Sequence, residues 1–235
     1  AGIEQVANEV GYNLIISQSL ESEEKEIINA KTLLDSGVDA LLVSLANDTS
    51  NYQHFENYTK RKIPLLFFDR VIDLPNCPTI LIDNQAAGYE ATKHLIDQGC
   101  SNLLHISGNL KRTLETDLDP KHIQVVIDTI KNSPKKIDGI FVASDNFAAN
   151  CIKELKKEGF KIPEDIKVVG FNNDPVSEII SPNLSTIEYP GYKMGILAGE
   201  SIIAHLNGSI NLQSTNTILL RHNLIIRESS SNQLN

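Results

Sequence analysis

The sequence predicts an α/β fold in which parallel strands are covered by helices on both faces. Short apolar runs, such as 39–45 and 138–143, alternate along the chain with longer amphipathic stretches. Glycines stand where several of these helical stretches end, at the position that favours a left-handed backbone. Single helices between strands are typical of βαβ units, and strands covered on both faces are continuously apolar.

Each element follows from the same local patterns. Residues 1–10 carry apolar side chains at helical spacing and end at Gly11, and Ser22 is a capping residue at the start of the second helix. Asp119 and Pro120 suit the first positions of a later helix. We expect strands at 13–17, 39–45, 63–68, 79–82, 102–107, 138–143, 166–171 and 184–188, with a strand pair in 216–226, and helices at 1–10, 22–36, 51–60, 84–98, from 119, 146–158 and 190–207.

Composition narrows the classes of partner. The chain has 235 residues, of which 41% are hydrophobic, so it can bury a sizeable core. Its formal net charge of -9 disfavours direct contact with nucleic acid or an acidic membrane surface. No apolar run approaches the ~20 residues of a membrane span. Cys77, Cys100 and Cys151 are isolated, which favours a reducing compartment, and we expect a cytoplasmic protein.

Motifs of catalysis and metal binding are not found. The sequence contains no glycine-rich phosphate loop, no G-x-S-x-G elbow and no H-E-x-x-H pair, and its six histidines are scattered without ligand spacing. We therefore expect no catalytic residues, no metal and no cofactor. The glycines of "GILAGE" (195–200) lie within a predicted helix, where they permit close packing.

Polar side chains follow four of the predicted strands. Because ligands of parallel α/β sheets bind beyond the carboxyl ends of the strands, these positions are candidate ligand contacts. The same residue types also cap helices, and we favour capping for Asp83 and Asp145. No clear helix begins after Asp69 and Arg70, whereas Asn172 fits either role. The four groups are Asp69-Arg70, Asp83-Asn84, Ser144-Asp145-Asn146 and Asn172-Asn173-Asp174.

Phe147 follows the polar group after the strand at 138–143. An exposed ring there would stack on a ligand, and core packing at the start of the helix is the alternative.

Seven motifs in order resemble the effector-binding part of the LacI/GalR family of transcriptional regulators. They are "GIEQVANEVGYNLIIS", "LLDSGVDALLV", "IPLLFFDR", "ILIDNQAAGYEATKHLIDQG", "GIFVASDNFAAN", "IPEDIKVVGFNND" and "SPNLSTIEYPGYKMG". The resemblance implies a two-lobe, periplasmic-binding-protein-like (type I) fold with a ligand cleft between the lobes. It implies one lobe of 1–83 plus 186–213 and another of 84–185 plus 214–235.

The resemblance also implies individual ligand contacts. Asp69, Ser144 and Asn172 match positions that face the ligand in relatives. Arg70 belongs to the family's common "D-R" pair. Asn172 is an amide where many relatives carry an acidic residue, so the ligand preference of those relatives does not transfer directly. Together with Phe147, these are the five candidate ligand-binding residues.

Three departures from the family pattern stand out. The helix-turn-helix headpiece and the first strand of the N-terminal lobe would precede Ala1. The run "HISGNLKRT" passes almost directly to "LETDLDP", where the family has another helix and strand. We therefore expect a segment to be missing near 112–114.

The function implied is a ligand-sensing transcriptional regulator that acts as a repressor. Its effector would be a sugar or nucleoside-like molecule, and it would form a homodimer that contacts DNA only through the absent headpiece, without a membrane partner. A periplasmic sugar-binding receptor of a transport system is the alternative, and an enzyme on this fold comes third.

Overall fold

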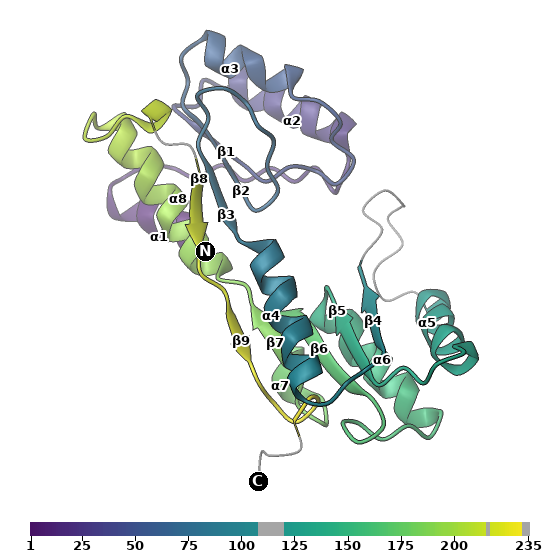
Figure 1. Ribbon diagram of the computed structural model, residues 1–235. Coiled ribbons are helices and arrows are strands. Elements are labelled where there is room, and N and C mark those ends of the chain that lie inside the picture. The colour runs from purple at the N-terminus through teal and green to yellow at the C-terminus, as the bar shows by residue number, and fades with distance from the viewer. Residues whose placement is uncertain (108–119, 215–216, 232–235) are drawn as a thin grey trace. The chain divides into compact units, whose positions relative to one another are not determined.

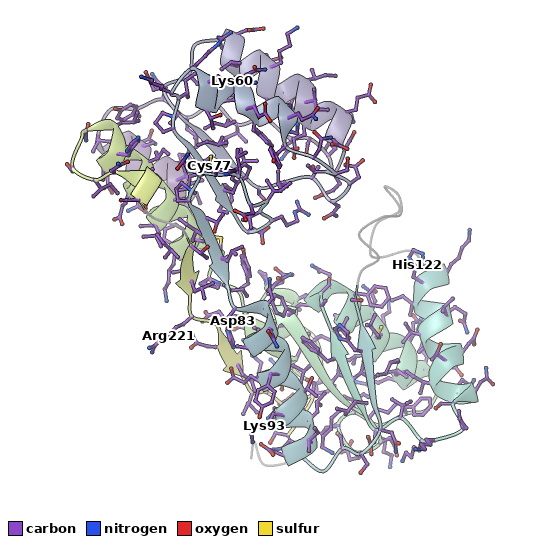
Figure 2. The ribbon with its side chains drawn as sticks, turned by 45° about the horizontal axis from the view of Figure 1, so that its top comes forward. Lys60, Cys77, Asp83, Lys93, His122 and Arg221 are labelled. Carbon is purple, nitrogen blue, oxygen red and sulfur yellow. The ribbon has the colours of Figure 1, made fainter. Side chains whose placement is uncertain are left out.

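The computed structural model describes residues 1–107, 120–214 and 217–231. It divides into two compact units, each built from separate stretches of the chain (Figure 1). Unit 1 comprises Ala1–Ile82 and Pro190–Arg221, and unit 2 comprises Asp83–Tyr189 and His222–Asn235. Asp83 opens a helix directly after a strand of unit 1, and Arg221 lies where the chain returns to unit 2 (Figure 2).

Unit 1 contains a four-stranded parallel sheet in the order β1-β2-β3-β8. Helix α8 packs against β2 and β3, and α1 packs against α8. The other helices contribute to a core of apolar side chains shared with β1 and β2. The bounds are β1 Leu41–Val43, β2 Leu65–Phe68, β3 Thr79–Ile82, β8 Thr217–Leu220, α1 Gly2–Glu9, α2 Glu23–Asp35, α3 Glu56–Lys60, α8 Gly191–Leu206, and the 3-10 turns η1 Gln53–Phe55 and η2 Leu212–Ser214.

Glycines bring α1 and α8 into close contact, as the "GILAGE" motif predicts. A Cβ on Gly2 would lie 2.4 Å from the Tyr192 carbonyl oxygen. From the other side, a Cβ on Gly195 would lie 3.2 Å from the Ile3 nitrogen, and one on Gly199 would lie 3.2 Å from the Val6 Cβ. The glycines therefore serve helix packing, and this prediction is confirmed.

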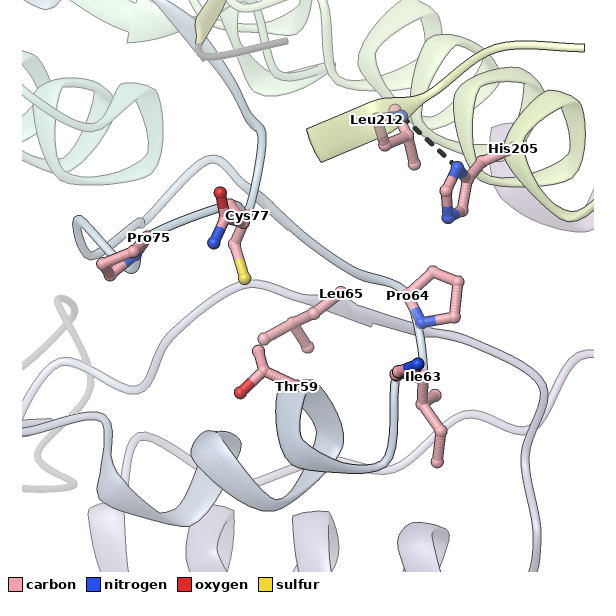
Figure 3. Close-up of a pocket in the computed structure, with 10 residues that line it drawn as sticks. Thr59, Ile63, Pro64, Leu65, Pro75, Cys77, His205 and Leu212 are labelled. Carbon is pink, nitrogen blue, oxygen red and sulfur yellow. Dashed lines mark hydrogen bonds between the residues drawn. The ribbon is translucent and has the colours of Figure 1, made fainter. Parts of the chain in front are cut away.

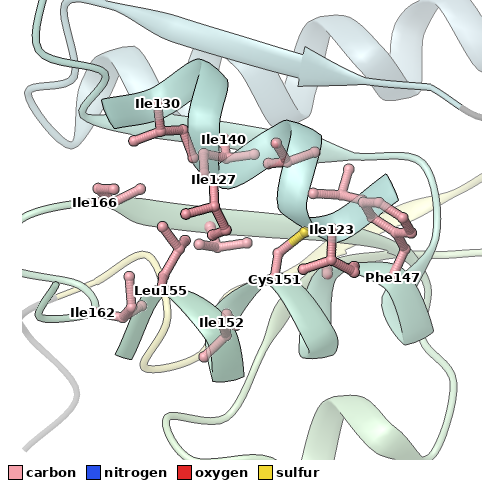
Figure 4. Close-up of a cluster of buried hydrophobic side chains, with 14 of the residues drawn as sticks. Ile123, Ile127, Ile130, Ile140, Phe147, Cys151, Ile152, Leu155, Ile162 and Ile166 are labelled. Atoms are coloured by element: carbon pink, nitrogen blue, oxygen red, sulfur yellow. The ribbon is translucent and has the colours of Figure 1, made fainter. Parts of the chain in front are cut away.

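Unit 2 contains a five-stranded sheet in the order β4-β5-β6-β7-β9, parallel except for β9. Helix α4 covers one face, while α6, with α5 beside it, covers the other. Figure 4 shows the apolar core on the α5 and α6 face of the sheet, where isoleucines of both helices contact Ile140 of β5. The bounds are β4 Leu103–Ile106, β5 Gly139–Val142, β6 Lys167–Asn172, β7 Ser185–Glu188, β9 Asn223–Ile225, α4 Asn84–Asp97, α5 Pro120–Asn132, α6 Asp145–Lys157 and the short α7 Val176–Ile179.

The strand expected at 13–17 is wrong. This stretch has no regular secondary structure, and Leu14, Ile15 and Ile16 are 37%, 59% and 73% exposed. Its apolar run suits a strand, but a strand also needs a neighbour to accept and donate its backbone hydrogen bonds. Among the described residues, 13–17 pairs with no strand.

The chain passes between the two units three times, and the expected lobe boundaries need correction at two of these passages. Strand β7 pairs with β6, so residues 186–189 belong to unit 2. Strand β8 pairs with β3, so the chain up to Arg221 belongs to unit 1. The predicted strand pair in 216–226 is therefore two strands in different sheets. The missing segment expected near 112–114 lies outside the described residues.

Candidate functional site

Asp69 directly follows β2 and has a positive φ of 63°. Its backbone nitrogen donates to the Ile80 carbonyl across 3.0 Å, which holds it against the neighbouring strand β3. The Ser44 hydroxyl donates to Asp69 Oδ2 across 3.3 Å. Ser44 follows β1, so two neighbouring strands end in side chains that contact each other. Sequence patterns did not mark Ser44, because it lies inside the strand expected at 39–45, whereas β1 ends at Val43.

Arg70 is held within unit 1. Its two terminal nitrogens lie 3.0 Å from the two carboxylate oxygens of Glu21, and its Nη1 also donates to Asn47 Oδ1 across 2.6 Å. Its Nε is buried without a hydrogen-bond partner among the described residues. The guanidinium thus links the segment before α2 to the loop after β1, and a ligand contact for Arg70 stays a prediction.

Ser144 is the N-cap of α6, because its hydroxyl accepts from the Phe147 nitrogen across 3.3 Å. Capping was the role favoured for Asp145, and that expectation is wrong. Asp83 does cap α4, accepting from the Ala86 nitrogen across 2.8 Å. A hydroxyl that caps a helix retains its own hydrogen as a donor, so a ligand contact for Ser144 stays a prediction.

Phe147 lies in the core of unit 2 and is 8% exposed (Figure 4). The exposed ring expected there is wrong, and the core alternative describes its position. From the first turn of α6, the Phe147 ring packs toward α5, and Ile123 of α5 belongs to the same apolar cluster. A ligand contact at the ring's remaining exposed edge stays a prediction.

Asn172 ends β6 with a positive φ of 115°, and Asn173 follows with a φ of 59°. The Asn172 backbone oxygen accepts from the Tyr189 nitrogen across 3.3 Å. Its side-chain amide, which is partly exposed, makes no hydrogen bond within the described part of the chain. The amide offers two donors and an acceptor at the carboxyl end of a central parallel strand.

Asp145 is fully buried beside this strand end. Its two carboxylate oxygens accept from the Thr186 hydroxyl across 2.7 Å and from the Asp174 nitrogen across 2.8 Å. Burial raises the pKa of Asp145, and these two hydrogen bonds act in the opposite direction. Arg227 donates to the Asn173 side-chain oxygen across 2.8 Å. No sequence signal marked Thr186 or Arg227, which reach this turn only through the fold.

A pocket of about 110 Å³ lies elsewhere in unit 1 (Figure 3). It opens at the amino ends of β2 and β3, whereas Asp69 lies at the carboxyl end of β2. Its lining includes Cys77, whose pKa burial raises to about 11, and His205, whose Nδ1 accepts from the Leu212 nitrogen across 3.3 Å. Ligand pockets for sugars and similar molecules usually exceed ~300 Å³, so this pocket is too small to be the effector site.

Within the described ranges, no cluster of three or more His, Cys, Asp or Glu side chains is placed to hold a metal ion. A search of the same ranges finds no helix with the length and apolarity needed to cross a bilayer.

Two family models match the chain. Residues 1–116 match periplasmic binding proteins and sugar binding domain of LacI family. Residues 110–230, just over half the chain, match periplasmic binding protein-like domain. The chain belongs to the LacI family of periplasmic-binding-protein-like domains. The two-unit α/β architecture of this LacI-family chain is the type I fold that the sequence resemblance implied.

Curated relatives of this LacI-family chain are transcriptional regulators. It is 28% identical to the ribose operon repressor of Halalkalibacterium halodurans, over 87% of this chain and 66% of that protein. It is 25% identical to catabolite control protein A of Priestia megaterium, over 97% of this chain and 76% of that protein. The chain thus spans about two thirds to three quarters of the length of these relatives.

Solved structures of the family superpose on nearly the whole chain. The periplasmic binding protein/LacI transcriptional regulator from Alkaliphilus metalliredigens, complexed with D-xylulofuranose, is 26% identical, with a TM-score of 0.78 over 98% of this chain and 92% of that one. The transcription regulator CcpA of Lactococcus lactis is 20% identical, with a TM-score of 0.82 over 98% of this chain and 92% of that one. The latter similarity establishes the fold alone.

Proposed function

We propose that this chain is the effector-binding core of a LacI-family transcriptional repressor and that its effector is a small polar molecule, most simply a sugar. The observation that carries the proposal is the Asn172 amide at the carboxyl end of β6, which makes no hydrogen bond to any described residue. In parallel α/β sheets, ligands bind beyond such strand ends. The bound sugar in the A. metalliredigens relative supports the same chemistry.

Candidate polar groups lie within each unit. The Asp69 carboxylate and the Ser44 hydroxyl belong to unit 1, and the Asn172 amide belongs to unit 2. A carboxylate accepts hydrogen bonds, whereas an amide both donates and accepts, and both kinds of group suit a neutral ligand rich in hydroxyl groups. An amide at residue 172 adds no negative charge there. A nucleoside-like effector remains the second class, because it also presents donors and acceptors without a net charge.

Contact with DNA is not expected of this chain itself. DNA would be contacted by a segment outside this chain, since a net charge of -9 opposes direct contact with phosphates. Regulation of transcription also places the protein in the cytoplasm. The relatives named above are regulators, which favours this role over a periplasmic transport receptor and over an enzyme.

A homodimer completes the proposal. Large apolar side chains are exposed directly after α1, on the segment 14–20 and on α2, and exposed apolar groups of this kind mark interaction surfaces. The most exposed of them are Val10, Ile15, Ile16, Leu20 and Ile28, at 52%, 59%, 73%, 54% and 56%.

Calorimetric titration of the chain with D-ribose, D-xylulose, cellobiose and adenosine tests the effector class. We expect one of the sugars to bind and Asp69→Asn to weaken that binding about tenfold, because asparagine keeps the left-handed backbone but loses the charge. Asp73→Asn, at an exposed position in the same loop, is the matched control and should bind normally. Binding of adenosine alone would replace the sugar class, and binding of none of the four would contradict the proposal.

A further inference from the structure

The backbone at the end of β6 adopts a conformation that needs support. Side-chain-bearing residues rarely have positive φ, and a φ of 115° at Asn172 lies outside the usual left-handed region. The adjacent Asn173 is also left-handed, with a φ of 59°. Two such residues in succession are maintained only where surrounding contacts determine the backbone.

Those contacts come from two other elements, α6 and β7. The Asn173 nitrogen donates to Thr186 Oγ1 across 3.3 Å, and the same hydroxyl donates onward to Asp145 Oδ1 across 2.7 Å. The second oxygen of Asp145 accepts from the Asp174 nitrogen across 2.8 Å. Asp145 begins α6 and Thr186 lies in β7, so one carboxylate and one hydroxyl connect the turn to both neighbouring elements.

Both supporting side chains are completely buried, at 0% exposure. The backbone of β6 approaches Asp145 so closely that a Cβ on Gly170 would lie 2.1 Å from Asp145 Oδ1. Arg227 completes the arrangement, because its Nη2 donates to Asn173 Oδ1 and to Glu178 Oε1, each across 2.8 Å. Asn173 is therefore held through both its backbone and its side chain, while the Asn172 amide makes no hydrogen bond within the described ranges.

We infer that Asp145 and Thr186 are positioning residues, which hold the 172–174 turn in its left-handed conformation and thereby present the Asn172 amide to the effector. This inference rests on the proposed function. Neither residue needs to touch the ligand, since each acts through Asn172. The Asp145 side chain accepts two hydrogen bonds at once, which aligns the turn before the ligand arrives and avoids an ordering cost on binding.

Thr186→Val tests the inference, because valine keeps the branched shape and removes the hydroxyl. Thr186→Ser restores the hydroxyl and serves as the rescue. Thr79→Val is the matched control, since Thr79 is a buried strand threonine of unit 1 whose hydroxyl donates to Thr217 across 3.0 Å. In the ligand-free chain, hydrogen exchange should accelerate about tenfold or more in the peptide covering 171–175 for Thr186→Val only. Unchanged exchange there would overturn the inference.

Sugar binding supplies a second and separate measurement. Thr186→Val should weaken binding about tenfold, Thr186→Ser by less than about threefold, and Thr79→Val not at all. Thr186→Val should add little in an Asn172→Gly background, because a residue that acts through Asn172 loses its effect once the amide is gone. Additive losses would overturn the inference. If no sugar binds the wild-type chain, the proposed function fails while the exchange result still decides the role of Thr186.

Discussion

The Thr186 hydroxyl donates a 2.7 Å hydrogen bond to the Asp145 carboxylate, although the two residues are 41 positions apart in the sequence. Neither side chain is exposed to solvent. The bond joins strand β7 to the start of α6, beside the turn that carries Asn172. The strand end of a parallel sheet is thus held by polar contacts from within the core, while the amide of Asn172 has no partner among the described residues.

Removal of the Asn172 amide should weaken effector binding about tenfold to a hundredfold, because the ligand group that it meets loses a hydrogen bond worth ~1–3 kcal/mol. Asn172→Gly is the cleaner variant, since alanine would be strained at a φ of 115°. Calorimetric titration with the sugar found by screening measures the loss, and Asn172→Ala should give the same or a larger one. Wild-type affinity in both Asn172→Gly and Asp69→Asn would remove these residues from the site.

Exposed isoleucines of α2 should contribute to dimerisation. Ile28 is 56% exposed, and a lysine there would place a charge in an apolar contact. We expect the wild-type chain to sediment as a dimer at micromolar concentration and Ile28→Lys to dissociate at least about tenfold more readily. Ile179→Lys is the control, because Ile179 is 80% exposed on α7 of the other unit. A monomeric wild-type chain at high micromolar concentration would refute the dimer.

The buried pair of Glu26 and His54 should stabilise unit 1 strongly. The Glu26 carboxylate lies 2.8 Å from His54 Nε2, and the two side chains are 7% and 6% exposed. It also accepts from the Ala46 nitrogen across 2.7 Å and from the Thr49 hydroxyl across 3.0 Å. Glu26→Ala should therefore reduce the free energy of unfolding by about 3–5 kcal/mol in chemical denaturation.

Glu56→Ala is the matched control for that substitution. Its partner Lys60 is 68% exposed and Glu56 itself is 39% exposed, so the loss should stay below about 1 kcal/mol. Equal losses in the free energy of unfolding for Glu26→Ala and Glu56→Ala would contradict the prediction that the buried pair stabilises unit 1 strongly.

His94 should make stability depend on pH. Burial lowers its pKa from the ordinary value of 6.5, and its Nε2 lies 2.7 Å from the Ser230 hydroxyl in the core. The folded state therefore favours the neutral ring. The stabilisation from the neutral His94 ring is complete above its ordinary pKa of 6.5. It is lost as the pH falls from that value through the lower pKa of the folded state.

Thermal denaturation between about pH 7.5 and about pH 5 measures this dependence. The melting temperature of the wild type should fall more steeply toward acid than that of His94→Gln, which has no titrating ring. His122→Gln, at an exposed position on α5, should follow the wild type. Parallel curves for the wild type and His94→Gln would contradict the prediction.

Gly170→Ala should destabilise unit 2, because the added Cβ would lie 2.1 Å from Asp145 Oδ1 and 2.9 Å from Leu184 Cδ2. We expect a loss of about 1–3 kcal/mol in the free energy of unfolding. Gly88→Ala provides the comparison within α4, where the nearest atom, Phe141 Cε1, is 3.9 Å away. Alanine there should stabilise the helix by up to about 1 kcal/mol, and a destabilisation would contradict the packing described.

Local patterns of the sequence identified most elements of both sheets. Apolar runs located β1 to β9 within a few residues, and the Ser22 cap and the glycines after α2, α4 and α6 located helix ends, because these features depend on backbone conformation over a few neighbouring residues. The same patterns placed Asp69 and Asn172 at strand ends. In a parallel sheet, the edge at which a strand ends follows from chain direction alone.

Only the tertiary structure decided which apolar runs pair as strands in a sheet and which side chains contact the turn after β6. Residues 13–17 have a strand's composition, but strand formation requires hydrogen bonds to a distant segment. Phe147 and Asp145 look like rim residues by position, yet packing against α5 and hydrogen bonding to Thr186 place both in the core. Pairing, burial and buried polar contacts depend on residues far apart in the chain, and no local pattern encodes which of them will meet.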